Sequence, residues 1–138
     1  MGKLENKVAI ITGGAGSIGL ITAKLFLQNG AKIMLVDVNE DSLKNAATEL
    51  QSPNVDYCVA DVTQSSDVEK YAQKTVDKFG KIDVFFNNAG IEGVVKPITE
   101  YPEENFDKVI AVNVKGVWLG MKHVLPSQCC CCSMVGFR

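Results

Sequence analysis

A glycine-rich run near the N-terminus, TGGAGSIG at Thr12–Gly19, combines residue types that could bind a phosphate group. It follows a short apolar run and precedes a segment whose apolar residues recur at helical spacing. Glycines permit backbone angles and close approaches that a Cβ would block, and the free N–H groups at a helix N-terminus favour anions. The run predicts a phosphate-binding turn; a glycine-rich turn without a ligand is the alternative.

A single acidic residue, Asp37, ends the next apolar run and could recognise a sugar. Its carboxylate can accept hydrogen bonds from a ribose 2′-hydroxyl and would repel a 2′-phosphate. None of the neighbours Val36, Val38 and Asn39 is a cation that could hold such a phosphate. The pattern indicates NAD(H) rather than NADP(H). The alternative is that Asp37 is a helix cap or a turn residue.

One amide side chain, Asn113, interrupts the apolar row of the last helical pattern. The row contains Phe106, Ile110, Val117, Gly120 and Val124. A buried amide without partners would cost about 1–3 kcal/mol, so we expect Asn113 to face the core and to be hydrogen-bonded, for structural or functional reasons. His123 has no nucleophile or metal ligand at a suitable spacing and is interpreted as a structural or surface residue.

Four of the five cysteines lie side by side in the last stretch of the sequence, SQCCCCSMVGFR (Ser127–Arg138). Cys129 and Cys132 form a C-x-x-C pair, but no second Cys or His pair follows at a spacing suited to zinc, so we predict no metal site. We expect residues 127–138 to be an unrelated, disordered tail, from a frameshift, a read-through intron or an artificial end. A natural short isoform and a thiol function are the alternatives.

Alternating strand and helix patterns must position these residues. Apolar runs predict strands at residues 7–12, 32–37, 55–61 and 82–87. Helical spacing predicts helices at residues 17–29, 41–51, 65–79 and 103–125. This alternation is typical of βαβ units with helices on both faces of a parallel sheet. We predict an α/β fold, a doubly wound but incomplete sheet of about four strands in the order 3-2-1-4, as one domain over residues 1–126.

The composition argues against several classes of partner. Fourteen basic and sixteen acidic residues give a net charge of −2, which argues against nucleic acid and against an anionic membrane surface. The sequence has no apolar window of about 18 residues, so we expect no membrane span. The N-terminus lacks the pattern of a secretory signal. We expect a cytoplasmic protein with reduced thiols.

In their order and spacing, these motifs resemble the short-chain dehydrogenase/reductase family. The cofactor motif of the family, Thr-Gly-x-x-x-Gly-x-Gly, is matched from Thr12 to Gly19, except that Ser17 replaces the middle glycine. ADV at Ala60–Val62 and NNAG at Asn87–Gly90 are similar to two further family signatures. The resemblance extends to about residue 126 and implies a Rossmann-type fold with a nicotinamide cofactor, for which Asp37 indicates NAD.

The resemblance also implies roles for individual residues. Asp61 and Val62 would bracket the adenine, and Asn87 would help to hold the sheet. Asn113 would hold a water molecule in the proton relay behind a catalytic lysine. The cofactor-binding residues expected are Thr12, Gly13, Gly14, Gly16, Ser17, Ile18, Gly19, Asp37, Val38, Asp61, Val62, Asn88, Ala89 and Gly90.

The acid/base group of the family's reaction is missing from this sequence. The family transfers hydride between the nicotinamide and a secondary alcohol or ketone, using a serine and a Tyr-x-x-x-Lys pair. None of the three tyrosines is followed four positions later by a lysine. We therefore predict the truncated cofactor half of an NAD-dependent oxidoreductase, inactive alone. Its family is usually homo-oligomeric, and part of that interface is lacking. The alternative is a non-catalytic NAD-binding or regulatory isoform.

Overall fold

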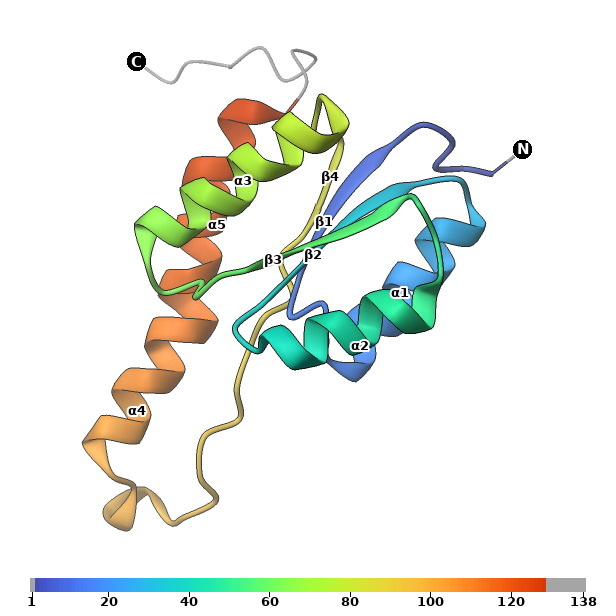
Figure 1. Cartoon of the computed structure of the whole chain (residues 1–138). Helices are drawn as coiled ribbons and strands as arrows, with labels where there is room; N and C mark the ends of the chain where they lie inside the picture. The colour runs from blue at the N-terminus through green and yellow to red at the C-terminus, as the bar shows by residue number, and fades with distance from the viewer. Residues whose placement is uncertain (1, 129–138) are drawn as a thin grey trace.

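The computed structural model describes residues 2–128 and contains one parallel sheet in the order β3-β2-β1-β4 (Figure 1). The strands are β1 (Val8–Thr12), β2 (Lys32–Asp37), β3 (Val55–Val59) and β4 (Val84–Phe86). The predicted α/β class and the strand order 3-2-1-4 are confirmed. Of the predicted tail, Ser127 and Gln128 are described; the cysteines Cys129–Cys132 lie outside the described residues.

The two inner strands, β1 and β2, are almost completely buried. They pair in parallel with Val8 opposite Lys32 and Thr12 opposite Val36. Continuous apolar runs are expected of strands that are covered on both faces. Because the strands are parallel and in this register, their carboxyl ends meet at one edge of the sheet.

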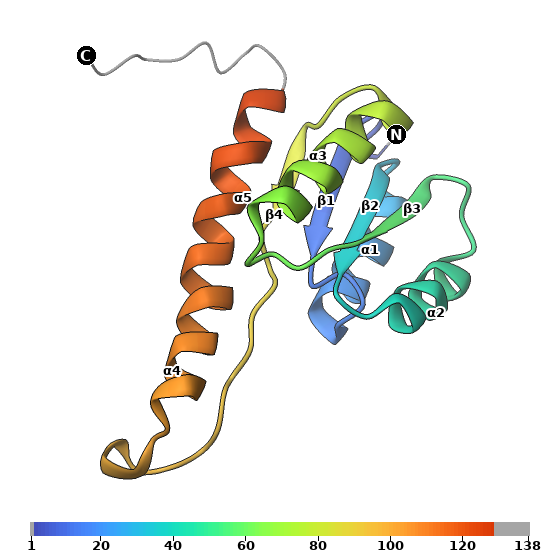
Figure 2. The ribbon, with the colours of Figure 1, turned by 60° about the vertical axis from the view of Figure 1, so that its left-hand side comes forward.

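Helices cover both faces of the sheet. They are α1 (Ser17–Gln28), α2 (Glu40–Leu50), α3 (Ser65–Phe79), α4 (Glu103–Ile110) and α5 (Val117–Val124). Two short 3₁₀ helices, η1 (Ile98–Glu100) and η3 (Leu125–Ser127), and the segment η2 (Ala111–Gly116) complete the described part of the chain. On one face Ile11 packs in a core with α1 and α2. On the other face Ile10 packs in a core with α3 and α5. Figure 2 shows these two helices side by side.

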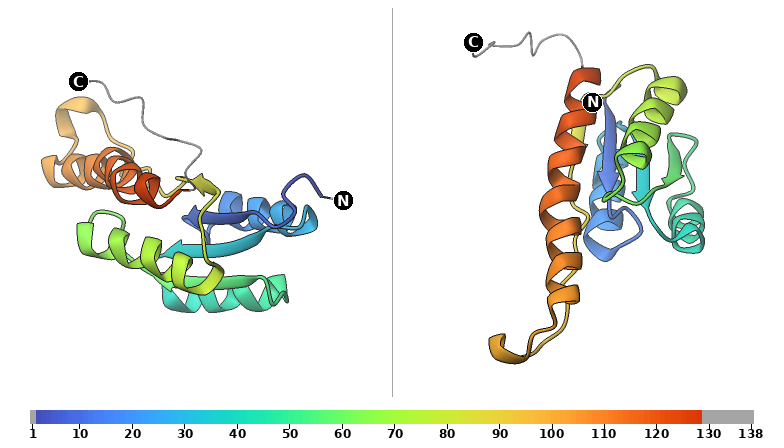
Figure 3. Two further views of the ribbon diagram at one scale, coloured as in Figure 1. Left: turned by 90° about the horizontal axis from the view of Figure 1, so that it is seen from above. Right: turned by 90° about the vertical axis from the view of Figure 1, so that its left-hand side faces the viewer.

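The last predicted helix, residues 103–125, is interrupted in its middle. The segment η2 is a π-helix between α4 and α5, a rare geometry that often occurs at functional sites. The long rod that these segments form extends beyond the sheet at its α4 end (Figure 3). Phe106 and Ile110 are therefore 56% and 41% exposed, and the expectation that they face the core is wrong. On α5, Gly120 and Val124 are buried as predicted.

Other predicted boundaries shift by one to a few residues. The helix expected at 41–51 begins at Glu40, because the side chain of Asn39 caps it by accepting a hydrogen bond from Ser42 N at 2.9 Å. The strand expected at 82–87 is shorter, and Ile82 instead forms an isolated parallel bridge with Gln128. Within residues 2–128, every helix is too short or too polar to span a bilayer.

Candidate functional site

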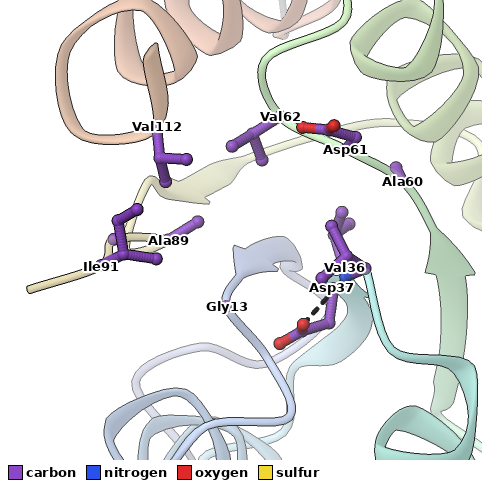
Figure 4. A pocket seen from close by; sticks show the side chains of 11 residues that line it. Gly13, Val36, Asp37, Ala60, Asp61, Val62, Ala89, Ile91 and Val112 are labelled. Carbon is purple, nitrogen blue, oxygen red and sulfur yellow. Dashed lines mark hydrogen bonds between the residues drawn. The ribbon is translucent and has the colours of Figure 1, made fainter. Parts of the chain in front are cut away.

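The candidate site lies where the carboxyl ends of the strands meet, and four segments of the chain line a pocket there (Figure 4). These segments are Gly13 of the glycine-rich turn, residues 36–38 after β2, residues 60–62 after β3 and residues 89–91 after β4; Val112 of η2 completes the lining. A second depression adjoins it and is lined by Gly16, Ser17, Ile18 and Asn88, among others. The fold thus brings most of the predicted cofactor-binding residues together.

The glycine-rich turn is shaped by contacts that exclude side chains. Gly13 has φ +63°, and a Cβ there would lie 3.0 Å from the side-chain nitrogen Nδ2 of Asn88. A Cβ at Gly19 would lie 2.3 Å from the carbonyl oxygen of Gly13. Gly16 is the N-cap of α1, and no side chain of the described residues caps that helix. The turn therefore offers close backbone approach and an open helix N-terminus, as an anion requires.

Thr12 joins the ends of β1 and β4 beneath the turn. It is fully buried, and its Oγ1 accepts hydrogen bonds from Asn88 N at 2.9 Å and Ala89 N at 3.1 Å. Asn88 Nδ2 donates in turn to the Thr12 carbonyl at 3.1 Å. Asn87 Nδ2 donates to Val117 O at 2.9 Å and ties β4 to α5. Thr12 thus supports the pocket from below, and its expected contact with a cofactor stays a prediction.

The Asp37 carboxylate is fixed at the rim of the pocket. Its Oδ2 accepts a hydrogen bond from Ala15 N at 3.3 Å and its Oδ1 accepts one from Val38 N at 2.8 Å. The N-cap of α2 is Asn39, so Asp37 does not take the alternative role of a helix cap. Next to it, the Val38 side chain is 64% exposed. A carboxylate and an apolar surface lie side by side here, as recognition of a ribose and a base requires.

The Asp61 carboxylate is oriented in a comparable way at the end of β3. Its Oδ1 accepts from Thr63 N at 2.9 Å and from Thr63 Oγ1 at 2.7 Å. Asp61 N donates to Asp67 Oδ2 at 2.8 Å. Among the residues described, no donor reaches Asp61 Oδ2. Val62 beside it is buried and lies against Gly116, where a Cβ would come within 2.8 Å of it.

Asn113 lies in η2 and is exposed, so the expectation that it faces the core is wrong. The rod carries this part of the chain past the edge of the sheet. The expected hydrogen bonds are present: Asn113 Oδ1 accepts from Ile91 N at 2.8 Å, and Asn113 Nδ2 donates to Ile91 O at 2.9 Å. This pair of bonds fastens the segment after β4 to η2. Sequence reasoning missed Ile91 and Val112 as pocket residues, although each directly follows or precedes a motif.

His123 joins α3 to α5 away from the pocket, as expected of a structural residue. Its Nε2 lies 2.8 Å from Ser65 Oγ, and its Nδ1 lies 3.5 Å from Glu69 Oε1. Two other reactive groups are buried in the core. Burial raises the pKa of the Cys58 thiol and of the Tyr71 hydroxyl, so neither group is poised for chemistry. Residues 2–128 contain no cluster of three or more metal-ligating side chains.

Comparisons with known proteins agree with this geometry. A family model described as short chain dehydrogenase matches residues 7–129. Levodione reductase from Leifsonia aquatica is 41% identical over 127 residues, which are 89% of this chain and 48% of that protein. The chain spans about half the length of the curated relatives it matches.

Two solved structures with bound cofactor are similar to this fold. A structure of NAD+-bound xylitol dehydrogenase has a TM-score of 0.86 at 36% identity, over 91% of this chain and 49% of that one. A 3-ketoacyl-(acyl-carrier-protein) reductase from Brucella melitensis, complexed with NADH, has a TM-score of 0.87 at 34% identity, over 91% and 51% of the two chains.

Proposed function

The chain belongs to the short chain dehydrogenase family, and from this premise we propose that its site binds NAD(H). The reaction that the site serves is hydride transfer between that cofactor and a secondary alcohol or ketone. The observation that carries the proposal is the Asp37 carboxylate, fixed at the end of β2 by two backbone N–H groups. A fixed negative charge there favours a ribose with a free 2′-hydroxyl over a ribose 2′-phosphate.

The features of the pocket support an assignment for each part of the cofactor. The open N-terminus of α1 would hold the pyrophosphate. Val38 and Ile91, 64% and 43% exposed, would cover the adenine, with Asp61 and Val62 at its edge. The segment Asn88–Gly90 would line the nicotinamide ribose. NAD would supply the hydride acceptor, and these residues would bind and orient it.

Hydride transfer also needs an acid/base residue from the protein, in addition to the bound cofactor. The sequence contains no Tyr-x-x-x-Lys pair, so we expect this chain to bind the cofactor without turning over a substrate. We also propose that Asn113 takes part in a proton relay. Its side chain is held in place by two hydrogen bonds to the backbone of Ile91. A second candidate function is non-catalytic NAD binding, which needs only the pocket described above. The cytoplasmic location and the homo-oligomeric tendency predicted from the sequence stay predictions.

Titration of the purified chain with NADH, and with NADPH as the comparison, tests the proposal. Trp118 is the only tryptophan and is half-exposed on α5, so its emission can report energy transfer to a bound reduced nicotinamide. We expect saturable quenching with NADH at concentrations where NADPH gives none. Equal quenching by both would contradict the role of Asp37. If neither cofactor quenches the emission of a chain with the expected helical circular dichroism, the proposal that the chain binds NAD(H) is contradicted.

A further inference from the structure

The outer edge of β3 has backbone groups that face away from the sheet. β3 pairs with β2 on one side only. At its two ends Asn54 O accepts from Ile33 N, and Ala60 N donates to Asp37 O, so the even-numbered residues face β2. Because the hydrogen-bonding direction alternates along a strand, the odd-numbered residues face outward. These residues are Val55, Tyr57 and Val59.

Side chains, rather than another strand, engage these outward groups. Lys74 Nζ donates to Tyr57 O at 2.5 Å, and Lys70 Nζ donates to Val59 O at 3.1 Å. The backbone N–H of Tyr57 is also engaged, because it donates to Asp56 Oδ1 at 2.8 Å. Three of the polar groups that an added strand would use are therefore already hydrogen-bonded.

The two lysines reach the edge together because they lie one turn apart on α3. The Lys74 ammonium lies 5.6 Å from the centre of the Tyr57 ring and 3.9 Å from Asp56 Oδ1. Its stem therefore runs along the outside of the strand. A strand that docked here would have to displace both ammonium groups and would leave them beside its own backbone. Positive charge on an edge strand is a known obstacle to edge-to-edge pairing.

The opposite edge of the sheet differs. Just before β4, the backbone of Ile82 forms an isolated parallel bridge with Gln128, so main chain engages the start of that edge, whereas β4 itself pairs with β1 only. We propose that Lys70 and Lys74 close the β3 edge to strand addition, and that the strand they exclude is the β3 edge of a second copy of this chain. The proposal is independent of cofactor binding.

The test is the double variant Lys70→Met/Lys74→Met in the full chain, because methionine keeps an apolar stem and removes the charge and the donors. We expect this variant to self-associate at about tenfold lower protein concentration than the parent, measured as weight-average mass by light scattering. The matched control is Lys78→Met/Lys115→Met, which removes two exposed lysines and the same two charges. It is expected to match the parent.

A backbone probe shows whether the association uses β3. The amide of Val59 faces outward, so its hydrogen exchange is expected to slow in the associated double variant and to stay fast in the parent. Adding Val59→Pro, which removes that outward donor without a loss in the ladder, is expected to return the double variant to the parent mass. The proposal is overturned if the lysine pair and the control pair associate alike. It is equally overturned if association leaves exchange at Val59 unchanged.

Discussion

The two walls of the pocket are built in different ways. On the β1–β2 side the strands are buried and the polar groups of Thr12 and Asp37 are hydrogen-bonded to the backbone of neighbouring loops. On the η2 side, the pocket is lined by the exposed Ile91 and the half-buried Val112. The Asn113–Ile91 pair of hydrogen bonds fastens the loop to η2. The sheet therefore preforms the first wall, whereas one side chain holds the second.

This difference predicts where a substitution will do most damage. A change in the first wall has to disturb the packed ends of β1 and β4, so it should affect folding and binding together. A change in the second wall should alter binding and leave the stability of the sheet nearly intact. Gly19→Ala, Thr12→Val and Asp37→Ala test the first wall, Asn113→Ala tests the second, and Tyr71→Phe lies in the core outside both.

Gly19→Ala is expected to have the largest effect. The new Cβ would lie 2.3 Å from Gly13 O and 2.9 Å from Gly14 Cα, so the turn must move. Overpacking of this kind costs about 1–3 kcal/mol of unfolding free energy, and we expect NADH binding to be lost with it. Urea unfolding and an NADH titration measure the two effects. Gly16→Ala is the control for the unfolding measurement alone, because its Cβ would meet Gly13 O at 3.3 Å and no other atom within 4 Å.

Thr12→Val is expected to lower the free energy of unfolding by about 1–3 kcal/mol, because it leaves the N–H groups of Asn88 and Ala89 without their acceptor. The control is Thr75→Val, another fully buried threonine, whose Oγ1 donates only to Tyr71 O one turn earlier in α3. That change removes a donor from a carbonyl on the same helix and should cost less. Equal losses in urea unfolding would contradict the supporting role of Thr12.

Asp37→Ala is expected to weaken NADH binding about tenfold, the equivalent of one charge-assisted hydrogen bond. NADPH binding should change less or improve, because the 2′-phosphate no longer meets a carboxylate. The ratio of the two dissociation constants is the measurement. Asp77→Ala on α3, whose carboxylate bonds Gln73, serves as the control. An unchanged ratio for Asp37→Ala would exclude Asp37 as the ribose partner.

Asn113→Ala tests the second wall and is expected to weaken NADH binding by a few-fold. The two bonds to Ile91 are exposed, so their loss should cost at most about 1 kcal/mol of unfolding free energy. A large fall in stability would show that η2 is part of the folded core rather than a locally held wall. Asn105→Ala on α4 is the control for loss of an amide from the same rod.

Tyr71→Phe is expected to have the smallest effect and the opposite sign. The Tyr71 hydroxyl is buried and has no hydrogen-bond partner within the described chain. Removing an unsatisfied polar group should leave stability unchanged or raise it by about 1 kcal/mol. A clear loss of stability in urea unfolding would show that the hydroxyl has a partner such as a buried water molecule.

The features predicted from sequence are those with a local physical cause. The glycine-rich turn, Asp37 and the α/β class follow from side-chain size, charge and alternating patterns, whereas the strand order was predicted from the usual order of doubly wound sheets. Helical periodicity could not distinguish a helix that covers the sheet from one that continues past it, so Phe106 and Ile110 were misplaced. The π-helical turn around Asn113 has no sequence period of its own. The closure of β3 depends on two lysines that reach another element, which no local pattern reveals.

The most direct test of the account is hydrogen exchange of the chain with and without saturating NADH, resolved to short segments. Bound NADH is expected to slow exchange at residues 13–19, 37–38, 61–63 and 88–91, and to leave exchange on the outer face of α3 unchanged. Protection confined to other segments would place the cofactor elsewhere and contradict the account. So would binding without protection of the glycine-rich turn.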